Sequence, residues 1–322
     1  MRSLRWLGLL ALYIGAQAVG LVLSQPFRSE GVVSTSNSQN PLSPLLILAI
    51  IVVAPLFILL FARRRGGIAA MRHLILLGIA GALYFTLYAT FSTLPPGLVL
   101  VPPYAAEVVL DFALAFAAIV SASLYLALLI EPQWYIVDLA GFLAAGALIA
   151  VLGLDFGILP AFILLTGLMV YDAVAVYVTK HMVSLADVVT EMKLPILMVM
   201  PDSAGYDYTN APTLAETRAQ PTEERSALFM GLGDVVIPGT LIVSAFVWLP
   251  TSPAFLGVGG NLWAAMGALV GSLVGYGILM RLVLRGKPQA GLPFLNGFAI
   301  LGYAVVYVLL FHSWTLGLTG AL

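Results

Sequence analysis

Two aspartates, Asp172 and Asp234, are the residues in this chain whose type and setting could do chemistry. Asp172 lies in an apolar run, 159–178, that is long enough to cross a membrane, and Asp234 is the only charge in MGLGDVVIPG, 230–239. A carboxyl group at membrane depth is energetically costly, so such groups usually have a function. Two carboxyls held close together cannot both ionise, so they share one proton and act on water as acid and base together. That chemistry is suited to hydrolysing a peptide bond.

The composition indicates that most of the chain is surrounded by lipid. Of its 322 residues 61% are hydrophobic and 9% charged, and the mean hydropathy is +1.05. A water-soluble domain of this length could not bury so much apolar surface. The net charge of −1 gives no general attraction to nucleic acid, so we expect no nucleic-acid partner. The absence of cysteine excludes disulfides and thiolate metal sites.

We therefore expect an all-α polytopic membrane protein with nine transmembrane helices, because spans need about 20 mostly apolar residues. The whole chain, 1–322, is expected to form a single membrane domain, with helices one to six in 1–179, a cytoplasmic connecting loop at 180–225 and helices seven to nine in 226–322. The beginning of the chain also resembles a signal peptide, but its apolar run continues to Leu23, which favours a first spanning helix. The expected spans are 6–24, 43–62, 73–91, 105–130, 135–152, 157–179, 226–249, 258–280 and 292–312.

The basic residues predict the orientation of these spans. With nine helices, every Lys and Arg except Arg28 falls on one face of the membrane. Lys and Arg concentrate in cytoplasmic loops. The N-terminus is therefore expected in the cytoplasm and the C-terminus outside it, in a multi-pass protein of the cell membrane.

The same topology places the two aspartates at one depth. Asp172 lies eight residues before Lys180, and Asp234 lies about eight residues after the expected start of helix seven at 226. At 1.5 Å per residue, both acids are roughly 12 Å below the cytoplasmic face. Consecutive antiparallel helices are usually neighbours, so we expect the two carboxyls to meet.

Three neighbouring residues fit such a site. Gly231 and Gly233 lack side chains beside Asp234, which allows another backbone to come close. Tyr171 precedes Asp172, and its hydroxyl needs a partner in lipid. A structural interpretation stays open, in which the glycines serve only helix packing and Tyr171 is a core aromatic.

These motifs resemble the presenilin and signal peptide peptidase family of intramembrane aspartyl proteases. VYDAVAVY (170–177) and GLGD (231–234) look especially like presenilin, and the nine-span layout is similar throughout. The resemblance implies that Asp172 and Asp234 are the catalytic pair. The family's third motif, Pro-Ala-Leu, corresponds to Pro293, Phe294 and Leu295, where Phe replaces Ala. Pro293 could also simply start a helix after Gly291.

The resemblance further implies a presenilin-like prokaryotic or archaeal homologue that cleaves transmembrane helix substrates in the lipid bilayer. It implies no cofactor, no metal and no obligate accessory subunit, and it leaves the oligomeric state open. The apolar segment LPILMVMP, 194–201, is too short to span and is expected to form a strand or an interfacial segment. As a strand, it could pair with an unwound substrate.

The main alternative is a secondary transporter or cation channel that uses intramembrane carboxylates. Glu107 and Asp111 share a helix face, and Asp138 lies near the inner end of helix five. No paired broken helices or inverted repeat of the transporter type is visible in the sequence. A metalloprotease would need HExxH, which the sequence lacks.

Overall fold

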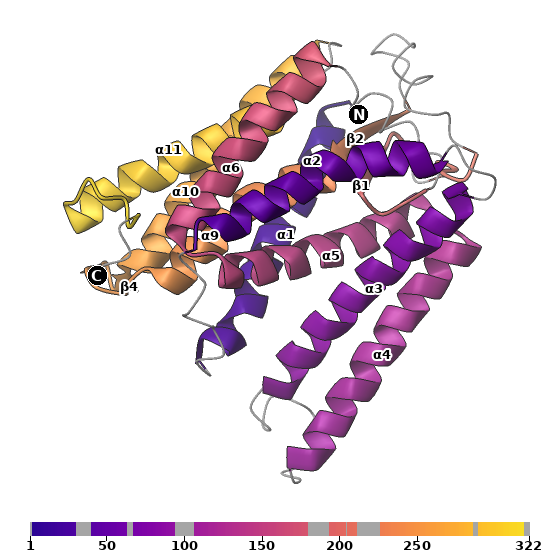
Figure 1. The fold of residues 1–322 in the computed structure, drawn as a ribbon, viewed down its shortest axis with the longest axis horizontal. Coiled ribbons are helices and arrows are strands. Elements are labelled where there is room, and N and C mark those ends of the chain that lie inside the picture. Colours follow the sequence, from indigo (N-terminus) through magenta and orange to yellow (C-terminus); the bar gives the residue numbers. More distant parts are fainter. Residues whose placement is uncertain are drawn as a thin grey trace.

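The computed structural model describes residues 2–29, 40–62, 67–93, 106–179, 193–203, 205–210, 226–285 and 289–318. Most of the expected connecting loop at 180–225 lies outside these ranges, as does Lys180. Within them the chain is mostly helical (Figure 1). The helices are α1 (Arg2–Ser29), α2 (Leu42–Ala62), α3 (Gly67–Thr93), α4 (Ala106–Ile130), α5 (Trp134–Asp155), α6 (Ile158–Ala173), the π-helix η1 (Val174–Val178), α9 (Leu232–Trp248), α10 (Gly260–Val283) and α11 (Leu292–Phe311).

Seven of the helices in the described ranges are long and apolar enough to cross a membrane. Two others, the described apolar part of α2 at Leu42–Ile51 and α9 at Leu232–Trp248, are shorter than this. The separator expected between the fourth and fifth spans is confirmed, because α4 ends at Ile130 and α5 begins at Trp134. The chain is thus a multi-pass membrane protein, whereas the count of nine spans stays a prediction.

The chain is mostly helical, as expected, and two short antiparallel strand pairs accompany the helices. Strand β1 (Leu197–Pro201) pairs antiparallel with β2 (Ala227–Gly231), and β3 (Ala254–Phe255) pairs with β4 (Val258–Gly259). Of the two interpretations of 194–201, the strand is therefore confirmed. The expected helix start at 226 is wrong, because a short apolar run suits a strand as well as a buried helix and β1 supplies a pairing partner here.

Helix α9 lies at the centre of the structure. It contacts α1, α5, α6, α10 and α11. From Leu232 to Phe246 every residue is buried except Gly233 and Asp234. A helix that is apolar on all sides belongs in an interior. The fold therefore carries Asp234 into the middle of the helical assembly and leaves an opening only there along this stretch.

Helices α10 and α11 pack closely because α10 carries a glycine every fourth residue. Side chains four apart lie on one helix face, so Gly267, Gly271 and Gly275 form one smooth strip. A Cβ added to Gly271 would lie 2.0 Å from the carbonyl oxygen of Phe298, and one added to Gly275 would lie 2.4 Å from that of Phe294. Small residues at such spacing let membrane helices approach backbone to backbone. This contact fixes the start of α11.

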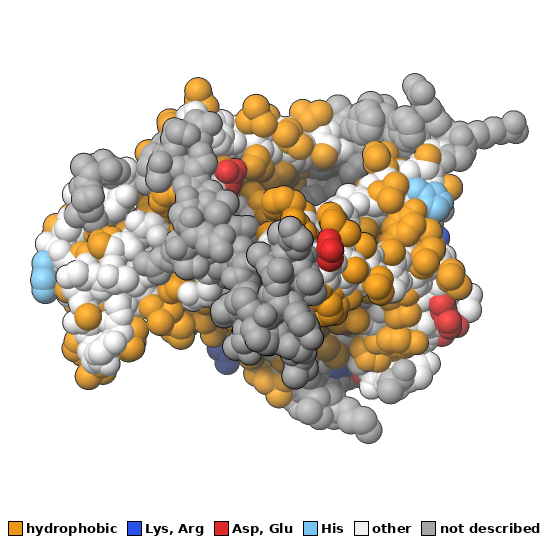
Figure 2. All heavy atoms as spheres, turned by 90° about the horizontal axis from the view of Figure 1, so that it is seen from below, with side chains coloured by type: hydrophobic (Ala, Val, Ile, Leu, Met, Phe, Trp, Pro, Cys, Tyr) orange, Lys and Arg blue, Asp and Glu red, His pale blue; other side chains and the backbone are white. Residues whose placement is uncertain are grey.

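The outer surface is largely apolar. Helices α3 and α4 lie side by side and reach away from the other helices (Figure 1), and both contact α5. Leu74 and Leu77 of α3 are more than half exposed, as is Leu126 of α4. Hydrophobic side chains cover much of the described surface in Figure 2, with few charges among them. Such a surface is suited to lipid and not to water.

Candidate active site

Asp172 is held at the C-terminal end of α6 by the start of α11. It is the second-last residue of α6, and its side chain is only 6% exposed. Its Oδ2 accepts a hydrogen bond from the backbone N–H of Leu292 at 3.0 Å. The first amides of a helix have no partner within that helix. The carboxyl group of Asp172 thus supplies one, across 120 residues of sequence.

Asp234 reaches the same point of α11 from another direction. It lies in the first turn of α9, directly after β2. A Cβ added to Gly291 would lie 2.8 Å from both carboxyl oxygens of Asp234 and 2.9 Å from its Cγ. The carboxyl group therefore packs directly on the backbone of Gly291, in the space that any other residue's side chain would fill.

The two carboxyl groups are consequently close to each other. Gly291 and Leu292 are consecutive, so standard bond lengths limit the nearest carboxyl oxygens of Asp172 and Asp234 to at most about 9 Å apart. At such a separation two negative charges in a poorly solvated site would repel each other. The expectation that two acids from helices six and seven lie near one another agrees with this geometry, although Asp234 sits only three residues into its helix.

The local electrostatics favour a pair that shares one negative charge. The positive end of the α11 dipole faces both carboxyl groups, and Asp234 also lies at the N-terminus of its own helix. Asp172, in contrast, lies at the negative end of α6. Two full charges in a poorly solvated site would repel each other, whereas one charge with one proton is stabilised by the helix amides.

Among the described residues, four hydrogen bonds join α6 and η1 to α11 and the residues just before it, including that of Asp172. The Tyr177 hydroxyl on η1 donates to Gln289 Oε1 at 3.0 Å and accepts from the Ala290 N–H at 3.2 Å. Deeper in the membrane, the Asn296 side-chain amide donates to the Leu165 carbonyl at 3.0 Å. The π-helix η1 begins two residues after Asp172 and carries Tyr177, so its wider turn contributes to the position of this tyrosine.

The glycines of GLGD differ in their surroundings. Gly231 ends β2, and a Cβ added there would lie 3.4 Å from Asp234 Oδ2, so it does adjoin the acid. Gly233 is exposed, and an added Cβ would meet nothing within 4 Å. Tyr171 is half-buried against the main core. Consecutive helix residues do not share a face, so the ring of Tyr171 and the carboxyl of Asp172 point in different directions.

The Pro-Phe-Leu motif forms the first turn of α11. Pro293 occupies the first turn of the helix, as the simple interpretation of a helix start expects. Phe294 is half-buried, and its carbonyl faces Gly275. Leu295 is fully buried in the main core. The motif therefore anchors the segment that meets both acids, and Leu295 does so from inside the protein.

Gly291 is the site residue that sequence reasoning missed. It appears in the sequence only as the residue before Leu-Pro, where a helix start explains it equally well. Its backbone is in the ordinary helical region, with φ −80° and ψ −47°. The reason for glycine here is thus the space taken by Asp234 and not an unusual backbone angle.

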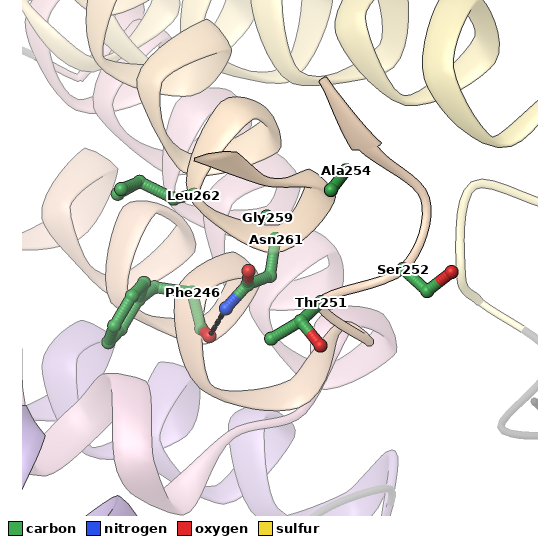
Figure 3. Close-up of a pocket in the computed structure, with 7 residues that line it drawn as sticks. All are labelled: Phe246, Thr251, Ser252, Ala254, Gly259, Asn261 and Leu262. Carbon is green, nitrogen blue, oxygen red and sulfur yellow. Dashed lines mark hydrogen bonds between the residues drawn. The ribbon is translucent and has the colours of Figure 1, made fainter. Parts of the chain in front are cut away.

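One pocket of the described chain lies away from the two acids. It has a volume of about 450 Å³, sits at the far ends of α9 and α10, and contains neither acid (Figure 3). Its buried Asn261 donates a hydrogen bond to the Phe246 carbonyl at 2.7 Å, which closes the corner between the two helices. Among the described residues, no group of three or more His, Cys, Asp or Glu side chains could hold a metal ion.

Comparison with known proteins gives one family. A family model described as "Signal-peptide peptidase, presenilin aspartyl protease" matches residues 10–312. Two crystal structures of a presenilin family intramembrane aspartate protease are similar. The C222 form has 30% identity and a TM-score of 0.60, covering 94% of this chain and 99% of the other. The P2 form has 31% identity and a TM-score of 0.58, covering 94% and 97%. No curated protein sequence matches.

Proposed function

The chain belongs to the signal-peptide peptidase and presenilin aspartyl protease family, and from this premise we propose that Asp172 and Asp234 are its catalytic pair. The protein is an intramembrane aspartyl protease, which hydrolyses peptide bonds within transmembrane segments of its substrates. Nothing in the family or the fold favours the transporter or channel alternative. Asp138, a further acid on a membrane helix, is buried and hydrogen-bonded to the backbone of β1.

The pair performs hydrolysis with one shared proton. The ionised carboxyl takes a proton from water as the water oxygen attacks the peptide carbonyl carbon. The protonated carboxyl gives its proton to the carbonyl oxygen, and a tetrahedral diol forms. Collapse of the diol breaks the C–N bond, and the leaving amine receives a proton from the pair. The two protonation steps belong to the dyad as a unit and not to one residue.

The main support for this proposal is that both carboxyl groups contact the same backbone segment: Asp234 packs on Gly291, and Asp172 accepts a hydrogen bond from Leu292. The test is cleavage of a single-span substrate in detergent by Asp172→Asn and Asp234→Asn. Each variant should lose essentially all product while its unfolding temperature stays near that of the parent. Asp155→Asn is the matched control, because Asp155 is an exposed aspartate at the C-terminal end of α5. Product from either site variant at the parental rate would refute the assignment.

We propose that a substrate peptide pairs as a strand with the edge of β2 that faces away from β1. Leu232 donates to the Ile196 carbonyl at 2.7 Å and Asp202 donates to Ser226 at 2.8 Å. Antiparallel bonds alternate along a strand, so the even-numbered residues of β1 bond to β2 and the odd-numbered ones point away. In β2 the outward-pointing backbone groups belong to Ala227, Phe229 and Gly231.

The sequence-based hypothesis placed the substrate on 194–201, but helix α5 lies against that edge of β1. Among the described residues nothing pairs with the other edge of β2, which leads directly to Asp234, and the space at Gly233 adjoins it. Proline at an outward-pointing position removes a donor without removing a bond to the partner strand. Phe229→Pro should therefore lower kcat/KM, whereas Phe229→Leu should not. Equal cleavage by both variants would reject pairing at β2.

Nine spans, with the N-terminus in the cytoplasm and the C-terminus outside the cell membrane, complete the proposed topology. The support is the distribution of Lys and Arg together with two further apolar helices, α2 of 21 residues and α9 of 17. Single cysteines placed at the two ends of this cysteine-free chain test it. A membrane-impermeant thiol reagent should label intact cells at the C-terminus only.

The proposed substrates are transmembrane helices, and we propose that the enzyme works without accessory subunits as a single membrane domain. Purified protein in detergent should cleave a single-span substrate with no other protein present. A strict requirement for an added membrane fraction would contradict this part of the proposal.

A further inference from the structure

Asp138 is a buried acid that the hydrolytic mechanism does not use. It lies near the start of α5 and is only 5% exposed. Its Oδ1 accepts a hydrogen bond of 2.6 Å from the backbone N–H of Val199 in β1. Its Oδ2 is buried without a hydrogen-bond partner among the described residues. A buried carboxyl bonded to one distant amide is an expensive arrangement, which calls for a reason.

The bond closes the outer edge of β1. Val199 is one of the odd-numbered residues whose amides point away from β2. One turn along α5, a Cβ added to Gly141 would lie 3.3 Å from the Pro195 carbonyl oxygen. Helix α5 therefore lies against the segment 195–199 and satisfies the amide that an unpaired strand edge would leave exposed.

Strand β1 in turn sets the position of β2 and of Asp234. The two strands are in register from Leu197 opposite Gly231 to Pro201 opposite Ala227. The amide of Leu232, the first residue of α9, bonds to the Ile196 carbonyl. The end of β1 is tied to α1 by the ion pair of Asp202 with Arg5. A shift of β1 along or away from α5 would thus move β2, and Asp234 follows β2 by three residues.

We propose that Asp138 is a positioning residue for cleavage: by holding the Val199 amide it fixes β1, and through β1 it fixes the edge of β2 and the carboxyl group of Asp234. This inference rests on the proposed function, because it assigns Asp138 a role in the reaction of Asp172 and Asp234. Asp138 touches neither the substrate nor the reacting atoms. Its effect should appear in where and how fast the bond is cut.

The experiment compares Asp138→Asn with Asp138→Leu in the full-length enzyme. Asparagine keeps an oxygen that accepts from Val199, whereas leucine has similar volume and no acceptor. The kcat/KM of the leucine variant should fall ~10-fold or more, since a buried donor loses its partner, and its products should spread over several cleavage positions. The asparagine variant should stay within about twofold of the parent and cut at the parental position. Asp155→Leu, at the exposed end of α5, is the control.

Hydrogen exchange at the Val199 amide gives a second measurement that does not depend on activity. Protection should be high in the parent and in Asp138→Asn, and low in Asp138→Leu. If Asp138→Leu does not fold, the test is made on Asp138→Asn alone, which should keep both the parental cleavage position and the parental protection of the Val199 amide. A folded leucine variant with parental kcat, KM and cleavage position overturns the proposal, as does an asparagine variant with tenfold lower activity. Failure of the proposed function itself would appear instead as activity retained by Asp172→Asn.

Discussion

Gly291→Ala is the substitution that tests the geometry of the site most directly. The added Cβ would lie 2.8 Å from both carboxyl oxygens of Asp234, whereas ordinary van der Waals contact begins at 3.4 Å. The carboxyl group must therefore move by about 0.6 Å. Displacements near 1 Å in a catalytic geometry cost about 100-fold in rate. We expect kcat to fall by about 10-fold to 100-fold.

The fold should tolerate this substitution. Gly291 has helical backbone angles, and Gly→Ala at such a position stabilises a protein by about 0.4–1 kcal/mol through the unfolded state. This gain in stability offsets the crowding between the new methyl group and the Asp234 side chain, which can rotate away. Loss of kcat with an almost unchanged unfolding temperature would therefore be the signature of displaced chemistry.

The assay is cleavage of a single-span substrate in detergent, with kcat and KM determined separately and thermal unfolding measured on the same preparations. Gly277→Ala is the control, because an added Cβ on that residue of α10 would meet nothing within 4 Å. It should keep parental activity and stability. Gly291→Ala with parental kcat would refute the reasoning, since the Asp234 carboxyl could not then lie where the structure places it.

Three further predictions follow from the helix contacts and from the segment between α6 and α9 that carries Tyr208. Gly271→Ala should lower the free energy of unfolding by about 1–3 kcal/mol, because its Cβ would collide with the Phe298 carbonyl; an unfolding temperature equal to that of Gly277→Ala would contradict this. Tyr177→Phe should lower kcat/KM by about threefold to tenfold, because Ala290 and Gln289 lose their partner; unchanged kinetics would show that these bonds do not hold Gly291. Burial raises the pKa of Tyr208 above its ordinary value of 10.0, so its contribution to stability is complete below pH 10 and is lost as the pH rises further. The unfolding temperature of Tyr208→Phe should therefore fall less steeply above pH 10 than that of the parent. An equally steep fall in both proteins would contradict the prediction.

The sequence was sufficient for the features that depend on composition and short spacing. Spanning helices follow from apolar length, and the boundary near Pro132 follows from the absence of a proline N–H. The proximity of Asp172 and Asp234 followed from their positions at matching ends of antiparallel helices. The strand at 197–201 was one of two interpretations, since a short apolar run has no periodicity to decide between them.

The features that were missed are set by contacts between distant parts of the chain. Residues 227–231 became a strand because β1 pairs with them, which local pattern cannot reveal. The role of Gly291 depends on its contact with the carboxyl group of Asp234, which lies 57 positions earlier in the sequence. Asp138 was visible in the sequence only as an acid near the inner end of helix five, and its bond to Val199, 61 residues away, could not be foreseen.

The narrow exposure of α9 has a consequence for inhibition. Gly233 and Asp234 alone are unburied between Leu232 and Phe246, so along this stretch of α9 water and peptide can approach only there. A compact apolar molecule lodged beside Gly233 would keep the nucleophile out without imitating any reaction intermediate. Such an inhibitor would bind through its packing against Gly233, so replacing Gly233 with a larger residue would confer resistance to it.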